Sequence, residues 1–145
     1  MVDAGSYRRL MGRLIYLTIT RPDLCCAVHI LSQFMQAPRE EHMNAARRIL
    51  CYIKGSPDCG LVIHAHSDLQ LIGYCDSDWG ACPITRQSLT GYLVTLGDSP
   101  ISWKTKKQTT VSQSFAEAEY RSIAAVTSEL VWLKSLLASF GIFHT

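Results

Sequence analysis

Apolar residues recur at helical spacing through the first third of the chain. In the run SYRRLMGRLIYL, Leu10, Leu14 and Leu17 fall on one face and the arginines on the other, which predicts an amphipathic helix. A second helical stretch follows Pro22, because proline suits the first turn of a helix. A third run, PREEHMNAARRILCYIKG, has acids at its start and bases toward its end, which a helix dipole favours. We expect Gly55 to lie just beyond this helix as its C-cap.

After this glycine the apolar runs become shorter and richer in β-forming residues. They predict strands over 60–64, 69–76, 89–96 and 101–104, the last two joined in a hairpin through Gly97-Asp98-Ser99-Pro100. Helical spacing returns near Ser114 and continues to about Ser139. Three helices, several antiparallel strands and one long helix together predict an α+β fold.

Composition narrows the class of protein. The chain has 145 residues, of which 48% are hydrophobic and 18% charged, so disordered and fibrous classes are excluded. No apolar stretch approaches the length needed to cross a bilayer, and we expect no membrane partner. The start, MVDAGSYRRL, has no apolar core, so we also expect no secretory signal.

Charge and cysteine content add two expectations. Residues 1–66 carry eight Lys and Arg against five Asp and Glu, whereas residues 67–145 carry six against seven. The first part is therefore basic, and the second is nearly neutral with clustered acids. The six cysteines form no C-x-x-C pair, and we expect them to be reduced, mostly small core residues. We do not expect a zinc site, because the spacing of Cys59, His64, His66, Cys75 and Cys82 matches no compact zinc motif.

Two acids, Asp76 and Asp78, follow the apolar strand predicted over 69–76. An acid at the end of a buried strand is costly unless it is solvated, paired or bound to a metal. We take the two side chains to point to opposite faces of the strand, and so to have different roles. A strand that simply ends in a polar turn is the other interpretation.

The long helix predicted from Ser114 carries Glu119 at the head of its apolar stripe. A carboxylate there is unusual if it only aids solubility, although glutamates also favour helix N-termini. Glu117 lies about 200° away around the helix and should be solvated. The stripe that Glu119 leads is Ile123, Val126, Leu130, Leu133 and Leu137.

If this helix packs across the strands, Glu119 could approach the strand end that carries Asp76. Converging carboxylates raise one another's pKa unless a cation neutralises them. Oxygen-only ligands suit Mg²⁺ or Mn²⁺, and pairs of such ions hydrolyse phosphodiesters.

A basic run, SWKTKKQ, places Lys104, Lys106 and Lys107 beside Trp103 and is followed by TTVSQS. Lysines with hydroxyl and amide donors suit backbone phosphates and ribose hydroxyls. An exposed strand edge protected by lysine is an equal alternative.

Motifs along nearly the whole chain resemble one family in collinear order. YRRLMGRLIYLTITRPDL, LSQFMQAPREEH and RRILCYIKGSPDCGL resemble the stretch between polymerase and nuclease in copia-type LTR retrotransposon polyproteins (Gag-Pol). LIGYCDSDWGAC, RQSLTGYLVTLGDSPISWKTKKQTTVSQSFAEAEY and ELVWLKSLL resemble the opening half of their ribonuclease H domain. The resemblance implies a helical reverse-transcriptase connection segment over 1–58 and a truncated ribonuclease H-like domain over 59–145.

The resemblance also implies roles for individual residues. Asp76 and Glu119 match the family's first two catalytic carboxylates, which would hold two Mg²⁺ or Mn²⁺ ions in the complete domain. Asp78 is a weaker metal candidate. Phe115 and the reversed Gly80-Ala81 depart from the family pattern, but neither departure removes a ligand. The residues expected to contact an RNA–DNA hybrid are Ser88, Lys104, Lys106, Lys107, Gln108 and Ser112.

The family's third catalytic carboxylate, on a later strand, has no counterpart in these 145 residues. We therefore expect an incomplete ribonuclease H-like fold, with antiparallel strands and one long helix but no parallel half. Our hypothesis is that the parent polyprotein degrades the RNA strand of RNA–DNA hybrids, while this chain alone is inactive; its status as an enzyme stays open. The alternative is a non-catalytic nucleic-acid-binding or purely structural remnant. The resemblance implies cytoplasmic particles or the nucleus, with an organelle as the alternative.

Overall fold

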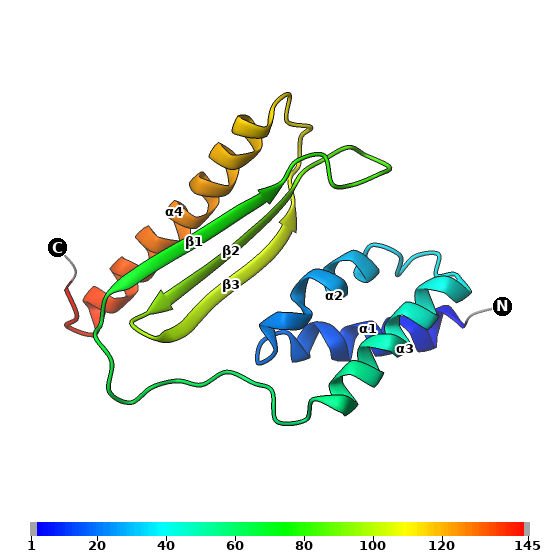
Figure 1. Ribbon diagram of the computed structural model, residues 1–145, viewed down its shortest axis with the longest axis horizontal. Helices are drawn as coiled ribbons and strands as arrows, with labels where there is room; N and C mark the ends of the chain where they lie inside the picture. Colours follow the sequence, from blue (N-terminus) through cyan, green and yellow to red (C-terminus); the bar gives the residue numbers. More distant parts are fainter. Residues whose placement is uncertain (1–2, 144–145) are drawn as a thin grey trace. The chain divides into compact units, whose positions relative to one another are not determined.

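The chain forms two compact units, Met1–Leu61 and Val62–Thr145, in a computed structural model that describes residues 3–143 (Figure 1). The first unit is helical, and the second contains a sheet and a long helix. The α+β class predicted from the sequence is confirmed, and the second unit is consistent with an incomplete ribonuclease H-like fold. The boundary between the units follows residue 61, three residues beyond the boundary predicted at 58/59.

The first unit consists of three helices and one 3₁₀ turn. Asp3 caps the first helix, because its carboxylate accepts hydrogen bonds from the Gly5 and Ser6 amides at 2.9 and 3.0 Å. Gly55 is the last residue of the third helix rather than the residue beyond it, and Ser56 takes the C-cap position. The elements are α1 (Ala4–Leu17), η1 (Pro22–Leu24), α2 (Cys25–Ser32) and α3 (Glu40–Gly55).

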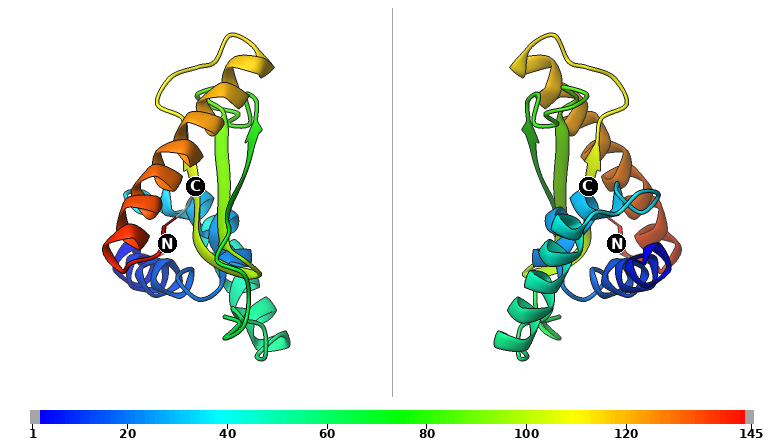
Figure 2. Two further views of the ribbon diagram at one scale, coloured as in Figure 1. Left: turned by 90° about the vertical axis from the view of Figure 1, so that its left-hand side faces the viewer. Right: turned by 90° about the vertical axis from the view of Figure 1, so that its right-hand side faces the viewer.

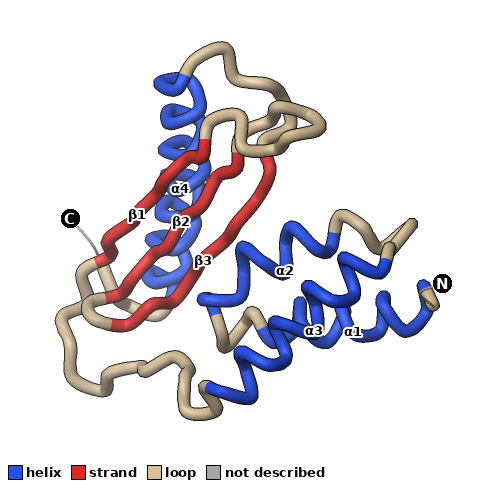
Figure 3. The backbone as a smooth tube through the Cα atoms, turned by 45° about the vertical axis from the view of Figure 1, so that its right-hand side comes forward, coloured by secondary structure: helices blue, strands red, loops and turns tan. Residues whose placement is uncertain are grey.

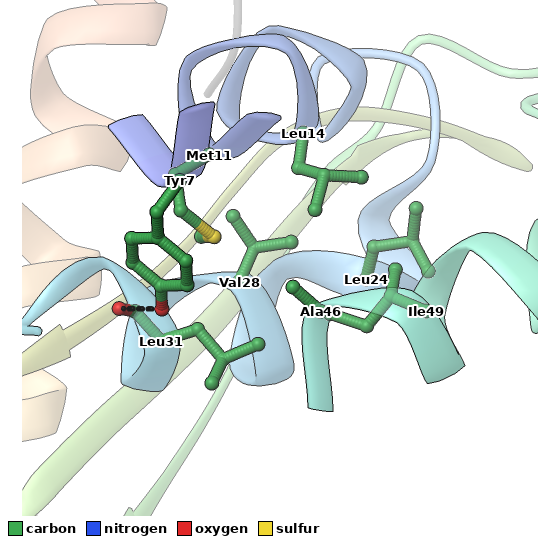
Figure 4. Packing of buried hydrophobic residues seen from close by; sticks show 8 residues of the cluster. All are labelled: Tyr7, Met11, Leu14, Leu24, Val28, Leu31, Ala46 and Ile49. Atoms are coloured by element: carbon green, nitrogen blue, oxygen red, sulfur yellow. Dashed lines mark hydrogen bonds between the residues drawn. The ribbon is translucent and has the colours of Figure 1, made fainter. Parts of the chain in front are cut away.

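One apolar cluster holds these helices together (Figure 4). Its α1 members are Tyr7, Met11 and Leu14, so the buried face of this helix is turned slightly from the leucine face predicted. Leu10 and Leu17 pack at its margin. The Tyr7 hydroxyl is buried and donates a hydrogen bond to the Leu31 carbonyl at 2.8 Å, so the aromatic ring reaches the core without an unpaired polar group.

A buried arginine links η1 to the C-cap residue of α3. Arg21 donates to both carboxylate oxygens of Asp23, at 3.0 and 2.9 Å, and to the Ser56 carbonyl at 3.1 Å. The hydrogen bonds from Arg21 hold the pKa of Asp23 below its usual range.

The second unit has two layers, a three-stranded antiparallel sheet and one helix across a single face of it (Figures 2 and 3). The strand order is β1-β2-β3, with β1 at one edge of the sheet and β3 at the other. Residues 60–64, predicted as a strand, are irregular: no strand pairs with them, and the apolar side chains of Val62 and Ile63 stay exposed. The elements are β1 (Leu71–Asp78), β2 (Leu89–Leu96), β3 (Ser99–Lys107) and α4 (Phe115–Ser139).

The face of α4 that packs on the sheet differs from the stripe predicted. The buried positions are Ala118, Ser122, Val126 and Leu133, whereas Ile123 is 47% exposed. The predicted stripe lies partly on the flank of the helix beyond β1, where the described residues place no further strand beneath it.

Close approach of α4 to β1 depends on a glycine. A methyl group at Gly73 would lie 2.9 Å from atoms of both Val126 and Leu130. The missing side chain therefore lets the helix lie directly on the edge strand.

The predicted β2–β3 hairpin is confirmed, and Gly97 makes its turn. This residue has φ +55°, in the left-handed region, and a methyl group there would overlap the Asp68 carbonyl oxygen. We expect Gly97→Ala to destabilise this unit by about 2 kcal/mol or more. Tryptophan fluorescence during urea unfolding measures this, because all three tryptophans lie beyond residue 61.

Gly91→Ala is the matched control, since a methyl group in the middle of β2 meets nothing within 4 Å. We expect it to stay within about 1 kcal/mol of the parent. Equal losses in the two variants would contradict a special role for the turn.

The cysteines do not behave as predicted. Cys26, Cys51 and Cys59 are exposed and the other three are half-buried, so the expectation that they are core residues is wrong. All six are free thiols. None of the helices within residues 3–143 is long and apolar enough to cross a membrane.

Candidate carboxylate site at the end of β1

The two acids of β1 share one face of the sheet, the face opposite to α4. Gly73 contacts α4, and burial alternates along β1, so Ser77 points to the helix while Asp76 and Asp78 point away from it. The expectation that the two acids lie on opposite faces is therefore wrong, because residues two apart on a strand point the same way. Both acids are exposed, and within the described residues neither carboxylate has a hydrogen-bond partner.

Glu119 lies on the flank of α4 that overhangs β1. It is eleven residues, or about three helical turns, before Leu130, whose side chain lies against Gly73. Glu119 is half-buried, and among the described residues its carboxylate accepts a single long hydrogen bond, from the Ser122 hydroxyl at 3.4 Å. Glu117, on the other side of the helix, pairs with Arg121 at 2.8 Å. Of the two glutamates, Glu119 is thus the one on the β1 side of the helix, and it forms no ion pair within the part of the chain that the structure describes.

The side chain of Gln108 joins the two backbone segments that carry these acids. Its amide nitrogen donates to the Ser77 hydroxyl at 3.3 Å and to the Ala118 carbonyl at 3.0 Å. Ser77 follows Asp76 in the chain, and Ala118 precedes Glu119. One half-buried amide therefore fixes the end of β1 relative to the start of α4.

Further hydrogen bonds extend this connection into a buried polar network. The two hydrogens of the Gln108 amide nitrogen are shared with a third acceptor, the Thr90 hydroxyl at 3.0 Å, and the side-chain carbonyl of Gln108 accepts from the Ser112 hydroxyl at 2.9 Å. The indole of Trp79 donates to the Ser112 carbonyl at 3.0 Å. We call Ser77, Thr90, Gln108 and Ser112 the Gln108 network.

This network changes the interpretation of three residues predicted to contact nucleic acid. Ser88 and Ser112 are 0% and 3% exposed, and the Ser88 hydroxyl accepts from the Gly80 amide at 3.1 Å. The side-chain amide of Gln108 is engaged within the protein. Because these groups bond internally, they position the strand ends and do not present donors to a ligand in this structure.

The lysines of the SWKTKKQ run lie on two different faces. Ser102 donates to Glu129 of α4 at 2.6 Å, so alternation along β3 turns Lys104 and Lys106 to the α4 side as well. Lys107 points to the opposite face, where its ammonium lies 3.9 Å from the Cys82 sulfur. Strand alternation thus divides the three lysines between two faces, although atoms of all three line one cavity beside α4.

The acids alone do not complete a metal site. No group of three or more His, Cys, Asp and Glu side chains within residues 3–143 could hold a metal ion. Asp76, Asp78 and Glu119 are thus not gathered into one cluster. Within residues 3–143, Asp76 and Glu119 form no ion pair, and carboxylate oxygens of this kind suit a hard divalent cation.

A thiol with a lowered pKa was not anticipated from the sequence. Cys82 sits in the turn between β1 and β2, and the Arg86 amide donates to its carbonyl at 2.8 Å. Hydrogen bonds from the Thr85 hydroxyl and neighbouring amides, with a smaller contribution from Lys107, lower the pKa of the thiol to about 7. Only the folded turn brings these donors to the sulfur.

We expect Cys82 to be alkylated by iodoacetamide with a rate that rises with pH and reaches half its maximum near pH 7. A lowered pKa means that the reactive thiolate already forms at neutral pH. Peptide mapping by mass spectrometry across a pH series measures the midpoint. Thr85→Val should move it upward, because the largest cause of the shift is lost, while Thr127→Val on the surface of α4 should not. A midpoint near 9, the ordinary value, in the unchanged chain would contradict this prediction.

Sequence comparison connects this chain to larger proteins. The retrovirus-related Pol polyprotein from transposon RE2 of Arabidopsis thaliana is 47% identical over 140 residues, covering 97% of this chain and 10% of the polyprotein. The corresponding polyprotein from transposon RE1 is 46% identical over 142 residues, with 98% and 10% covered. The secreted RxLR effector protein 161 of Plasmopara viticola is 40% identical over 128 residues, covering 88% of this chain and 90% of that protein.

The chain therefore spans about a tenth of the length of the two Pol polyproteins. No protein-family model matches it, and no solved structure does.

Proposed function

Because the chain belongs to the family of retrovirus-related Pol polyproteins of copia-type retrotransposons, we propose that it joins the end of a reverse transcriptase to the first half of a ribonuclease H domain. In the parent polyprotein this region contributes to degrading the RNA strand of RNA–DNA hybrids. Residues 1–58 belong to the connection segment, and residues 59–145 belong to the nuclease.

The observation that carries the proposal is the double contact of Gln108. Its amide bonds to Ser77 and Ala118, the neighbours of Asp76 and Glu119, so one side chain holds both acid-bearing segments. A nuclease of this kind needs carboxylates on separate elements held at a fixed separation, because its metal ions are bound by several segments at once.

In the complete domain, Asp76 and Glu119 would be ligands for Mg²⁺ or Mn²⁺. When bound, paired ions activate water and stabilise the leaving oxygen of a phosphodiester. The remaining ligands would come from other parts of the polyprotein, since the described residues offer no third acid beside these two. We accordingly propose that this chain alone cleaves hybrid poorly or not at all.

The test is incubation of the purified, folded chain with a labelled RNA–DNA hybrid and Mg²⁺ or Mn²⁺, beside an Asp76→Asn variant. We expect no cleavage from either chain. Cleavage that disappears in the variant would mean that these 145 residues complete the site by themselves, against the proposal. Cleavage that persists in the variant would indicate a contaminating nuclease or a different site.

A second candidate is a free-standing, non-catalytic protein. The RxLR effector protein 161, a chain covered to 90% by this one, supports it, because a protein of about this extent occurs on its own in that relative. Adding the downstream part of a related polyprotein to the chain distinguishes the two candidate functions. Cleavage restored by that addition, and dependent on Asp76, supports the nuclease; a folded complex without cleavage supports the non-catalytic protein.

A further inference from the structure

The outer edge of β1 is a free strand edge, because within residues 3–143 β2 pairs with one side of β1 and no strand pairs with the other. The Gly97 amide donates to the Gln70 carbonyl at 2.8 Å, and these two residues continue the β1–β2 register. Alternation along an antiparallel ladder therefore turns the backbone groups of the even-numbered residues of β1 toward β2. The residues whose amides and carbonyls point to the free side are Leu71, Gly73, Cys75 and Ser77.

The flank of α4 next to this edge is apolar. Glu129 bonds to β3, so the opposite side of the helix projects beyond β1. Ile123 and Leu130 lie on that side, roughly 40–60° around the helix from Val126, which packs on β1. Ile123 is 47% exposed, and Leu130 is half-buried. An apolar strip thus overhangs the free edge.

Two opposite charges flank this strip. Glu119 is one turn before Ile123 and Lys134 is one turn after Leu130, on the same side of α4. Within the described part of the chain neither charge forms an ion pair. Roughly 22 Å of helix separates the two, so they cannot pair within one molecule. The flank therefore carries an acid at one end and a base at the other.

A second copy running in the opposite direction complements this flank. Glu119 then faces Lys134 of the second copy, and Ile123 faces Leu130 of the second copy. Both pairs are centred on the same point of the helix, between residues 126 and 127. A surface that matches its own reversed image is suited to an isologous two-fold contact.

The strand edge has its centre at the same level. The four outward residues of β1 are centred on Tyr74, and Val126 lies against the neighbouring Gly73. In Figure 1, α4 extends along the length of β1. One two-fold axis through Tyr74, perpendicular to the sheet, therefore serves both the strands and the helices. Strands pair about 4.8 Å apart and α4 covers β1 and β2, so the two helices would lie on the order of 10 Å apart, as packed helices do.

The other face of the sheet is compatible with this register. Tyr74, which is 56% exposed, would face Tyr74 of the second copy as a cross-strand aromatic pair. Asp76 would face Ile72 of the second copy rather than another acid. No like charges are therefore directly opposed across the joined edges.

We propose that the free edge of β1 and the adjoining flank of α4 bind a second copy of this chain, which gives a two-fold dimer with a continuous six-stranded sheet. The occupant is a second copy because the surface matches itself in charge, in apolar pattern and in strand register. Pairing also covers an edge that would otherwise be open to aggregation. The dimer requires neither a metal ion nor cleavage, so it does not rest on the nuclease proposal.

The test is sedimentation velocity of the full chain in EDTA over a range of concentrations, which should show a monomer–dimer equilibrium. Lys134→Glu sets two carboxylates against each other in both helix contacts and should raise the dimer Kd on the order of tenfold. Glu119→Lys/Lys134→Glu exchanges the charges and should return the Kd to within about threefold of the parent. Lys106→Glu, the same change at an exposed position of the opposite edge strand, is the matched control and should leave the Kd unchanged. Equal circular dichroism spectra verify that all variants are folded.

A chain that stays monomeric up to about 100 µM would overturn the proposal. A dimer that is insensitive to Lys134→Glu, or weakened equally by Lys106→Glu, would assign the contact to another surface. A charge-exchange variant that dimerises no better than Lys134→Glu would rule out this register. Species that grow beyond the dimer with concentration would contradict a closed two-fold contact. Because no metal ion or nucleic acid is present, these outcomes are independent of the nuclease assay.

Discussion

Replacing Gln108 with leucine is expected to lower the free energy of unfolding of the second unit by about 2–4 kcal/mol. Leucine is close in size to glutamine but offers no hydrogen bonds. It would leave the Ser77, Thr90 and Ser112 hydroxyls without their partner beneath α4, where exposure is 3%, 7% and 3%. Each unsatisfied buried group costs about 1–3 kcal/mol, although relaxation recovers part of this. The melting temperature should fall by roughly 10–20 °C.

Thermal unfolding followed by tryptophan fluorescence reports this unit alone, because its residues include all three tryptophans. Gln87→Leu is the matched control: the Gln87 amide also bonds a backbone carbonyl, that of Thr109 at 2.8 Å, but in an exposed setting. It should cost no more than about 1 kcal/mol. Similar losses in the two variants would show that the Gln108 network adds nothing beyond an ordinary surface hydrogen bond.

Asp76→Asn, in a longer polyprotein segment that cleaves RNA–DNA hybrid, is expected to reduce cleavage on the order of a thousandfold or more. Asparagine keeps the size of the side chain but loses the charge that a divalent cation requires. Because Asp76 is exposed and without a protein partner in the described residues, the fold should be unaffected. Initial rates with a labelled hybrid at saturating Mg²⁺ measure the loss, and unchanged melting temperatures separate it from unfolding.

Asp98→Asn, in the exposed β2–β3 turn, is the matched control and should cleave like the parent. Asp78→Asn should lose less activity than Asp76→Asn, since only Asp76 matches the first catalytic carboxylate of the family. Full activity in Asp76→Asn would remove this residue from the catalytic site and the nuclease proposal with it.

The sequence alone determined the secondary-structure elements that depend on residues close together in the chain. The β2–β3 hairpin follows from Gly97-Asp98 between two β-rich runs, and α4 begins where Ser114 accepts a hydrogen bond from the Glu117 amide at 3.1 Å. The α+β class followed from the switch in apolar period after Gly55. The order of motifs along the chain was also enough to indicate its family. In each case the decisive residues are neighbours in the chain.

Only the tertiary structure decided which faces meet. Two adjacent stripes of α4 are plausible cores. Packing buried the stripe with Ala118, Ser122 and Val126, and Val126 lies directly against Gly73 of β1, where a larger residue would not fit. Residues 60–64 have β-forming composition but no partner strand, and a strand exists only through pairing.

Tertiary packing also decided where the lysines of β3 point and which groups Gln108 bonds. Lys104 and Lys107 look equivalent along the run, but alternation along β3 turns Lys104 to the face that α4 covers and places the Lys107 ammonium beside the Cys82 sulfur. The Gln108 side chain carries amide donors that could contact a ligand, yet it donates to Ser77 and Ala118, which are 31 and 10 residues away in the chain. The apolar period can be read from a short segment, whereas the burial of a side chain and its hydrogen-bond partners depend on contacts between residues distant in sequence.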